Sequence, residues 1–206
     1  MQKYLIRAVS AAIVVSSIPM LARAESNIQT GAGALTATAR LDFRITVPKT
    51  LFLQVGTGTA SANDTTINLI DFVVPAPNIG DGTPIAATAV SGDLGNGTVT
   101  AKVVGNNGNV TLSSTTAGAL GNGAGDTISF AQIATTAAVL TSATALAAPA
   151  LVDGGSTNTT VPATGKIVNR DARWTFSFLN SAIVPPGTYG GVNANNSRVT
   201  YTAAMP

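Results

Sequence analysis

Residues 37–47 read ATARLDFRITV and alternate between apolar and polar side chains along their whole length. Every odd position is apolar, and the even positions carry Thr, Arg or Asp. Because successive side chains of a strand point to opposite faces, this period of two predicts a long strand with one apolar face. Pro48 interrupts the ladder of backbone donors, and residues 51–55 resume the alternation as a second, shorter strand.

The composition of the chain is also typical of a β-protein. Thr and Val favour a pleated strand, whereas Gly and Asn favour tight turns. Turn sequences such as Gly-Asp-Gly at 80–82 and Asn-Asn-Gly at 106–108 separate the further strand candidates. These candidates are residues 66–74, 84–90, 97–104, 109–113, 127–131, 173–179 and 197–203. Short strands joined by regular turns predict an all-β fold, an antiparallel sandwich.

Two turns and one strand carry more specific expectations. Residues 98–104 and 110–113 are predicted to form a hairpin. Residues 121–128 partly match a calcium-binding nonapeptide, but that site needs stacked copies, so a hairpin turn is the better interpretation. Trp174, Phe176 and Phe178 occupy alternate positions, which predicts that they share the core face of one strand.

Residues 132–150 mix alanine with threonine and do not decide between a loop with a short helix and an irregular strand. A polar loop is predicted over residues 154–160, which read Gly-Gly-Ser-Thr-Asn-Thr-Thr.

The N-terminus has the three parts of a secretory signal. Lys3 and Arg7 give a positive start, residues 8–21 are mostly apolar, and Ala22 and Ala24 are the small residues that a signal peptidase reads. The apolar stretch is shorter than the roughly 20 residues needed to span a bilayer, and no later stretch is long enough. We therefore expect residues 1–24 to be a cleaved signal peptide and the protein to be exported, and not an integral membrane protein.

Cleavage would change the charge of the protein. The signal contains Lys3, Arg7 and Arg23 of the 11 Lys and Arg residues and none of the 9 Asp and Glu residues, which leaves eight positive side chains against nine negative ones. The basic character of the full chain therefore belongs mostly to the signal. Nucleic-acid binding, which requires clustered positive side chains, is not expected.

The chain contains no Cys and no His. An exported protein without cysteine has no disulfide to stabilise it and relies on packing, strand pairing or assembly. The usual zinc ligands, thiol nucleophiles and imidazole bases are also missing. The Asp residues mostly lie beside Gly or Asn, where they commonly form turns. We expect no enzyme activity, catalytic residue, metal site or cofactor.

Several segments resemble those of a known family. The sequence Pro-Pro-Gly-Thr-Tyr at 185–189, followed by Val-Thr-Tyr-Thr at 199–202, resembles the C-terminal region of chaperone–usher pilins, where a Pro-x-Gly-x-Tyr turn precedes the last strand. Residues 127–133 are similar to a strand in the middle of such subunits, and a signal followed by an alternating strand is similar to their N-terminal extension. The resemblance is strongest to the cysteine-free branch of alternate or class 5 fimbriae.

The resemblance implies an incomplete immunoglobulin-like sandwich over residues 44–206. Residues 25–43 would then be a donor-strand extension, with Leu35, Ala37, Ala39 and Leu41 as the face that inserts into a neighbouring subunit. It also implies a periplasmic chaperone, an outer-membrane usher and other copies of the chain as partners, and a location in a surface fimbria.

Three alternatives stay open at this point. Residues 35–43 could be the first core strand of a closed domain. The protein could be a self-contained adhesin or surface-layer module that binds through Trp174 or residues 154–160. It could also be a polysaccharide hydrolase whose carboxylate pair is distant in the sequence.

Overall fold

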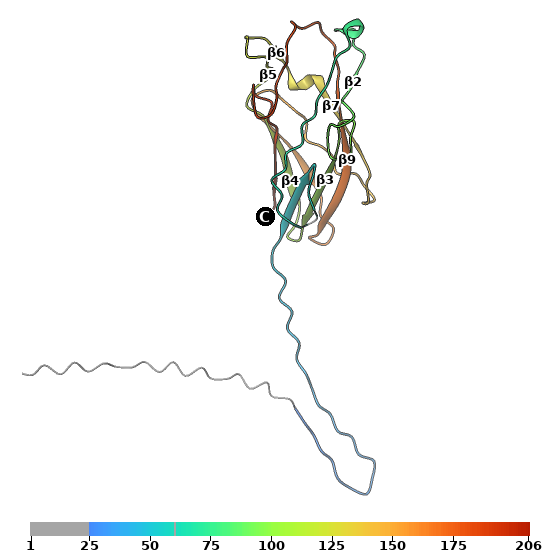
Figure 1. Ribbon diagram of the computed structural model, residues 1–206. Coiled ribbons are helices and arrows are strands. Elements are labelled where there is room, and N and C mark those ends of the chain that lie inside the picture. The colour runs from blue at the N-terminus through green and yellow to red at the C-terminus, as the bar shows by residue number, and fades with distance from the viewer. Residues whose placement is uncertain (1–24, 60) are drawn as a thin grey trace, which may run out of the picture. The chain divides into compact units, whose positions relative to one another are not determined.

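The computed structural model describes residues 25–59 and 61–206, and its ordered elements are almost all strands (Figure 1). The predicted signal peptide, with Ala22 and Ala24, lies outside the described residues. The chain divides into two units that meet between Val47 and Pro48. We call residues 25–47 the arm and residues 48–206 the body, and describe each by itself.

The body contains ten strands and two short 3-10 helices within its described residues. Their bounds are β1 (Leu51–Val55), η1 (Ala76–Asn78), β2 (Ile85–Ala86), β3 (Thr98–Gly105), β4 (Val110–Thr115), β5 (Leu120–Gly121), β6 (Thr127–Ile128), η2 (Phe130–Gln132), β7 (Ile133–Ala138), β8 (Ser156–Val161), β9 (Val168–Phe178) and β10 (Thr200–Ala204).

Every strand pair is antiparallel. In the larger sheet β1 pairs with β3, β3 with β9, and β9 with β7, while β2 pairs with the last residues of β9. The second sheet has the order β10–β4–β8, and β5 and β6 form a separate two-stranded hairpin. The sequence-based prediction of an all-β antiparallel sandwich is confirmed.

The register defines two ends of the body. Leu51 and Val168 both pair with Gly105 at one end, which we call the root end because β1 begins there directly after the arm. At the opposite end, which we call the tip end, Phe178 pairs with Ile85 and with Ile133.

The core lies between the two sheets. It joins residues of β3 and β9 in the larger sheet to Val110, Leu112 and Val161 in the second sheet. Trp174 is at its centre, fully buried, and its indole N–H donates a hydrogen bond of 2.7 Å to the carbonyl of Leu146. The prediction that Trp174, Phe176 and Phe178 share one core face is confirmed, since all three are buried.

The predicted hairpin between residues 98–104 and 110–113 is wrong. Both strands exist, but β3 belongs to the larger sheet and β4 to the second. The Asn-Asn-Gly turn carries the chain from one sheet to the other, because the same turn residues suit a crossing between sheets as well as a return within one. The hairpin expected at 121–128 is present as β5 and β6.

Three other segments are decided by the structure, two of them against expectation. Residues 156–160 of the predicted polar loop belong to β8, which pairs with β4 along its whole length. Residues 133–138 of the undecided segment form β7. Residues 66–74 form no strand, although their burial alternates.

We predict that Trp174→Ala lowers the free energy of unfolding by about 3–5 kcal/mol, because it leaves a large cavity in the core. Denaturant unfolding followed by circular dichroism measures the change. The control is Arg173→Ala at the neighbouring exposed position, which should change stability by less than about 0.5 kcal/mol. A loss of similar size in both variants would contradict a core role for Trp174.

Candidate functional site

The four predicted donor residues lie in the arm, where residues 25–47 contain no helix and no strand. Leu35, Ala37, Ala39 and Leu41 are all exposed, and 71% of the Leu41 surface is accessible. The structure therefore does not show residues 35–43 as a core strand of the chain to which they belong.

The apolar face of the arm extends beyond the four residues singled out from the sequence. Phe43 and Ile45 continue the same odd-numbered series and are 86% and 87% exposed, and Val47 is also exposed. Their alternation was visible in the sequence. Phe43 lay within the predicted extension but outside the four residues chosen, and the boundary after residue 43 assigned Ile45 and Val47 to the sandwich. Each large apolar side chain forgoes about 1.5–3 kcal/mol while it remains in water, which is unusual for a surface without a partner.

One ion pair joins the two ends of a bend within the arm. The Arg40 guanidinium donates hydrogen bonds of 2.7 and 2.8 Å to the Glu25 carboxylate across the bend at residues 31–33. These bonds lower the pKa of Glu25 and raise that of Arg40. Both groups are exposed, and such pairs contribute little, so this contact is a weak restraint on the arm.

One edge of the larger sheet consists of two segments. The first is β1, which pairs with β3, and the N–H of Gly56 extends this pairing to the carbonyl of Thr100 at 2.7 Å. The chain then leaves the edge and returns at Asn68, whose side chain accepts a 2.7 Å hydrogen bond from the N–H of Thr57.

Residues 68–74 continue this edge toward the tip end. The carbonyls of Leu69 and Asp71 accept hydrogen bonds from the N–H groups of Gly92 and Thr88, at 3.3 and 2.8 Å. The N–H of Asp71 instead donates to the Ser91 hydroxyl, so a side chain replaces part of the backbone ladder and no regular strand forms here. We call β1 and residues 68–74 together the first edge; among the described residues, no segment pairs with β1 on its outer side.

The second sheet ends on the same side of the sandwich with β10. This strand pairs with β4, and no described strand pairs with its other side. β1 and β10 are neighbours across the two sheets. At the root end, Lys49 and Asn107 both donate hydrogen bonds to the carbonyl of Pro206 and hold the end of β10 beside the start of β1.

Apolar side chains along both edges pack against the core but remain half-buried. Tyr201 illustrates this, because its ring lies 5.3 Å from that of Trp174 while part of its surface is accessible. Its burial is sufficient to raise the pKa of its hydroxyl. The half-buried apolar residues of the first edge are Leu51, Leu53, Val55, Ile70 and Phe72, and those of the second are Tyr201, Ala203 and Met205.

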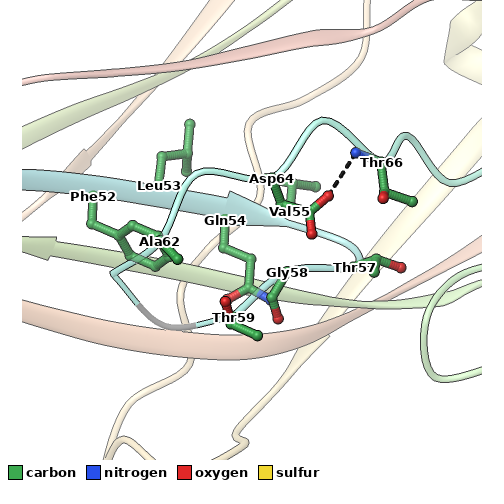
Figure 2. Close-up of a pocket in the computed structure, with 10 residues that line it drawn as sticks. All are labelled: Phe52, Leu53, Gln54, Val55, Thr57, Gly58, Thr59, Ala62, Asp64 and Thr66. Carbon is green, nitrogen blue, oxygen red and sulfur yellow. Dashed lines mark hydrogen bonds between the residues drawn. The ribbon is translucent and has the colours of Figure 1, made fainter.

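A small cavity of about 100 Å³ lies between β1 and the loop that leaves the first edge (Figure 2). The Gln54 amide donates hydrogen bonds of 3.0 and 3.2 Å to the carbonyls of Gly56 and Gly58. Asp64 accepts a 2.7 Å hydrogen bond from the N–H of Thr66, which also lowers the pKa of the carboxyl. The Gln54 amide therefore ties the start of the loop to β1, and the Asp64 carboxylate forms a turn within the loop.

The features proposed for a binding module have structural roles. Trp174 is inaccessible at the centre of the core, and residues 156–161 are a strand.

In the segment at 185–189, the Tyr189 hydroxyl donates a 2.8 Å hydrogen bond to the carbonyl of Pro185, and the N–H of Gly190 donates one to the carbonyl of Gly121 in β5.

Asp171 is a buried carboxylate that the sequence did not single out. Burial opposes its ionisation, but hydrogen bonds from the Thr141 hydroxyl and from the N–H groups of Ser142 and Thr141 outweigh this effect and lower the pKa to about 2. Its carbonyl accepts a 3.1 Å bond from the N–H of Leu146, the residue whose carbonyl binds Trp174. Asp171 therefore anchors a loop that closes the core.

A second, more open hollow of about 440 Å³ lies beside this loop, between Ala143, Pro162 and Arg170. Within residues 25–59 and 61–206, no three acidic side chains come close enough to hold a metal ion. Over the same ranges, no helix has the length and apolar character required to cross a bilayer.

Comparison with protein-family models, with curated proteins and with solved structures gives no match to the chain. The resemblance to pilins therefore rests on the short segments described above.

We predict that Asp171→Asn lowers the free energy of unfolding by about 2 kcal/mol at pH 7, because hydrogen bonds to a charged carboxylate are replaced by weaker ones. The folded-state pKa is lowered, so this advantage is complete above the ordinary Asp value and is lost as the pH falls from about 4 to about 2. Urea titrations of both proteins across this range measure the difference. A difference that does not change with pH would contradict the assignment.

Proposed function

We propose that the protein is a structural subunit of a surface pilus and assembles by donating its arm to the two open edges of a neighbouring copy. The observation that carries this proposal is the exposed apolar face of the arm, from Leu35 to Val47, together with the outer sides of β1 and β10, which pair with no strand in the part of the chain that the structure describes.

The lengths of the two surfaces match. As a strand, residues 35–47 extend about 40 Å, and β1 continued by residues 68–74 extends about the same distance. Backbone hydrogen bonds to the open edges would provide strength, and the odd-numbered side chains would fill the space over the half-buried apolar residues. Larger side chains near Val47 and smaller ones at Ala37 and Ala39 would give the insertion a single register.

The body also favours one direction for the inserted arm. β10 runs toward the root end, where Pro206 lies beside Lys49. An arm antiparallel to β10 runs toward the tip end and places the donor's root end against the acceptor's tip end. An arm parallel to β10 would place the donor's root end against the acceptor's root end. The root end of each copy would then have to contact two neighbouring copies, the one that donates to it and the one that it donates to. Antiparallel insertion therefore suits an open chain of identical copies.

The arm and the open edges would need protection before assembly, because exposed apolar strands and unpaired edges promote aggregation. A periplasmic chaperone and an outer-membrane usher, the partners implied by the resemblance to pilins, would supply this protection. Export through the periplasm after removal of residues 1–24 is part of the same proposal.

We predict that the protein from Glu25 onward forms multimers and that a version lacking residues 25–47 stays monomeric but binds a peptide of residues 34–47. Ile45→Asp should reduce multimer formation at least about tenfold, because it places a charge on the inserted face. Thr46→Asp is the matched control: it adds the same charge on the opposite face of the arm and should assemble as the unchanged protein does.

Analytical ultracentrifugation measures the multimers, and fluorescence anisotropy of a labelled peptide measures its binding. Strand donation is wrong if the full and arm-deleted proteins are equally stable monomers and the peptide does not bind.

A further inference from the structure

Two loops at the tip end of the body are joined by a buried asparagine. Asn180 is almost completely buried and has a left-handed backbone with φ of 53°. Its side-chain carbonyl accepts a 3.0 Å hydrogen bond from the N–H of Gly80, and its main-chain carbonyl accepts one of the same length from Gly82. Its amide N–H₂ group donates to the carbonyl of Asn78 and to the Asp81 carboxylate. Residues 78–82 and 180–183, which we call the tip, are thereby held together.

A second side chain fixes the tip to the larger sheet. The side-chain carbonyl oxygen of Gln132 accepts hydrogen bonds of 3.2 and 2.8 Å from the N–H and the hydroxyl of Ser181. The main-chain carbonyl of Gln132 accepts a 2.7 Å bond from the N–H of Leu179. Loops at the end of a sandwich are commonly mobile, so this amount of bonding indicates a surface whose shape is held in advance.

The large side chains that the tip presents to solvent include two isoleucines. Ile183 is 79% exposed, and Ile79 is also exposed. The two loops pack closely: a Cβ added to Gly80 would lie only 2.5 Å from the Ile183 side chain, so only glycine fits there. The tip follows directly on residues 68–74 through Pro75 and η1, so it continues the first edge. Buried polar bonding beneath exposed isoleucines is an arrangement suited to contact with another surface.

We propose that the tip is the docking surface for the root end of the neighbouring copy whose arm is inserted. This inference rests on the proposed function, since an arm that runs toward the tip end leaves its own root end beside the tip. The root end offers apolar partners, because Pro48, Ile167 and Pro206 are all exposed there.

The charges of the two ends are also complementary. The tip carries the exposed carboxylate of Asp81 and no positive side chain, whereas the root end carries Lys49 and Lys166. Contact between two tips or two root ends would bring like charges together. The tip would thus add a second, rigid contact to the flexible connection that the arm provides, and would limit bending between successive copies.

The test separates docking of the tip from insertion of the arm. Ile183→Asp changes an exposed side chain and should leave the fold intact. In the arm-deleted protein, this variant should bind the 34–47 peptide with unchanged affinity. In the protein with its arm, it should reduce multimer formation by about tenfold. Val139→Asp, at an exposed position after β7, is the matched control and should change neither measurement.

The reciprocal variant Ile167→Asp, at the root end, should reduce multimer formation to a similar extent. The fold-reduction in the double variant should be smaller than the product of the fold-reductions in the two single variants. If Ile183→Asp assembles as well as Val139→Asp while both bind the peptide, the tip contact is wrong and strand donation stands. If the peptide binds none of the arm-deleted proteins, strand donation and the tip contact are both wrong.

Discussion

The main chain of an edge strand carries donors and acceptors that require partners, and this constraint governs the rest of the structure. On one side of the sandwich, the outer groups of β1 and β10 have no partner among the described strands. The arm also lacks partners, since its apolar face is exposed and its backbone forms no strand ladder. The chain contains no cysteine, so no disulfide compensates for these open groups. Joining the arm of one copy to the edges of another would satisfy both.

Polar side chains hold the loops of the body through hydrogen bonds. Asp171 fixes the loop that covers Trp174, and Asn180 joins two loops at the tip end. Every buried side-chain polar atom in the described residues has a hydrogen-bond partner. Fully bonded polar groups of this kind favour one arrangement of the loops, and under strand donation a preformed site would lose less conformational entropy on binding.

The sequence was sufficient for the features that depend on local periodicity. The strand around Trp174 and the turn after Leu120 follow from side-chain pattern and turn chemistry. The strand predicted over residues 37–47 is wrong for the single chain, because their backbone groups pair with no other described strand and alternation alone does not supply a partner. β8 was missed because every residue before Val161 is polar on both of its faces, so its strand character depends on pairing with β4. The error at β3 and β4 arose because turn residues do not specify which sheet the next strand joins. Asp171 and Asn180 bind groups that are distant in the sequence, and no local pattern marks such contacts.

Amide hydrogen exchange of residues 35–47 in assembled material tests strand donation most directly. Insertion places the backbone N–H groups of the arm in a ladder with β1 and β10, so their exchange should slow by several orders of magnitude relative to the unassembled chain. Exchange of the arm at the rate of an unstructured peptide, in multimers that are otherwise intact, would show that the copies are joined by a different contact.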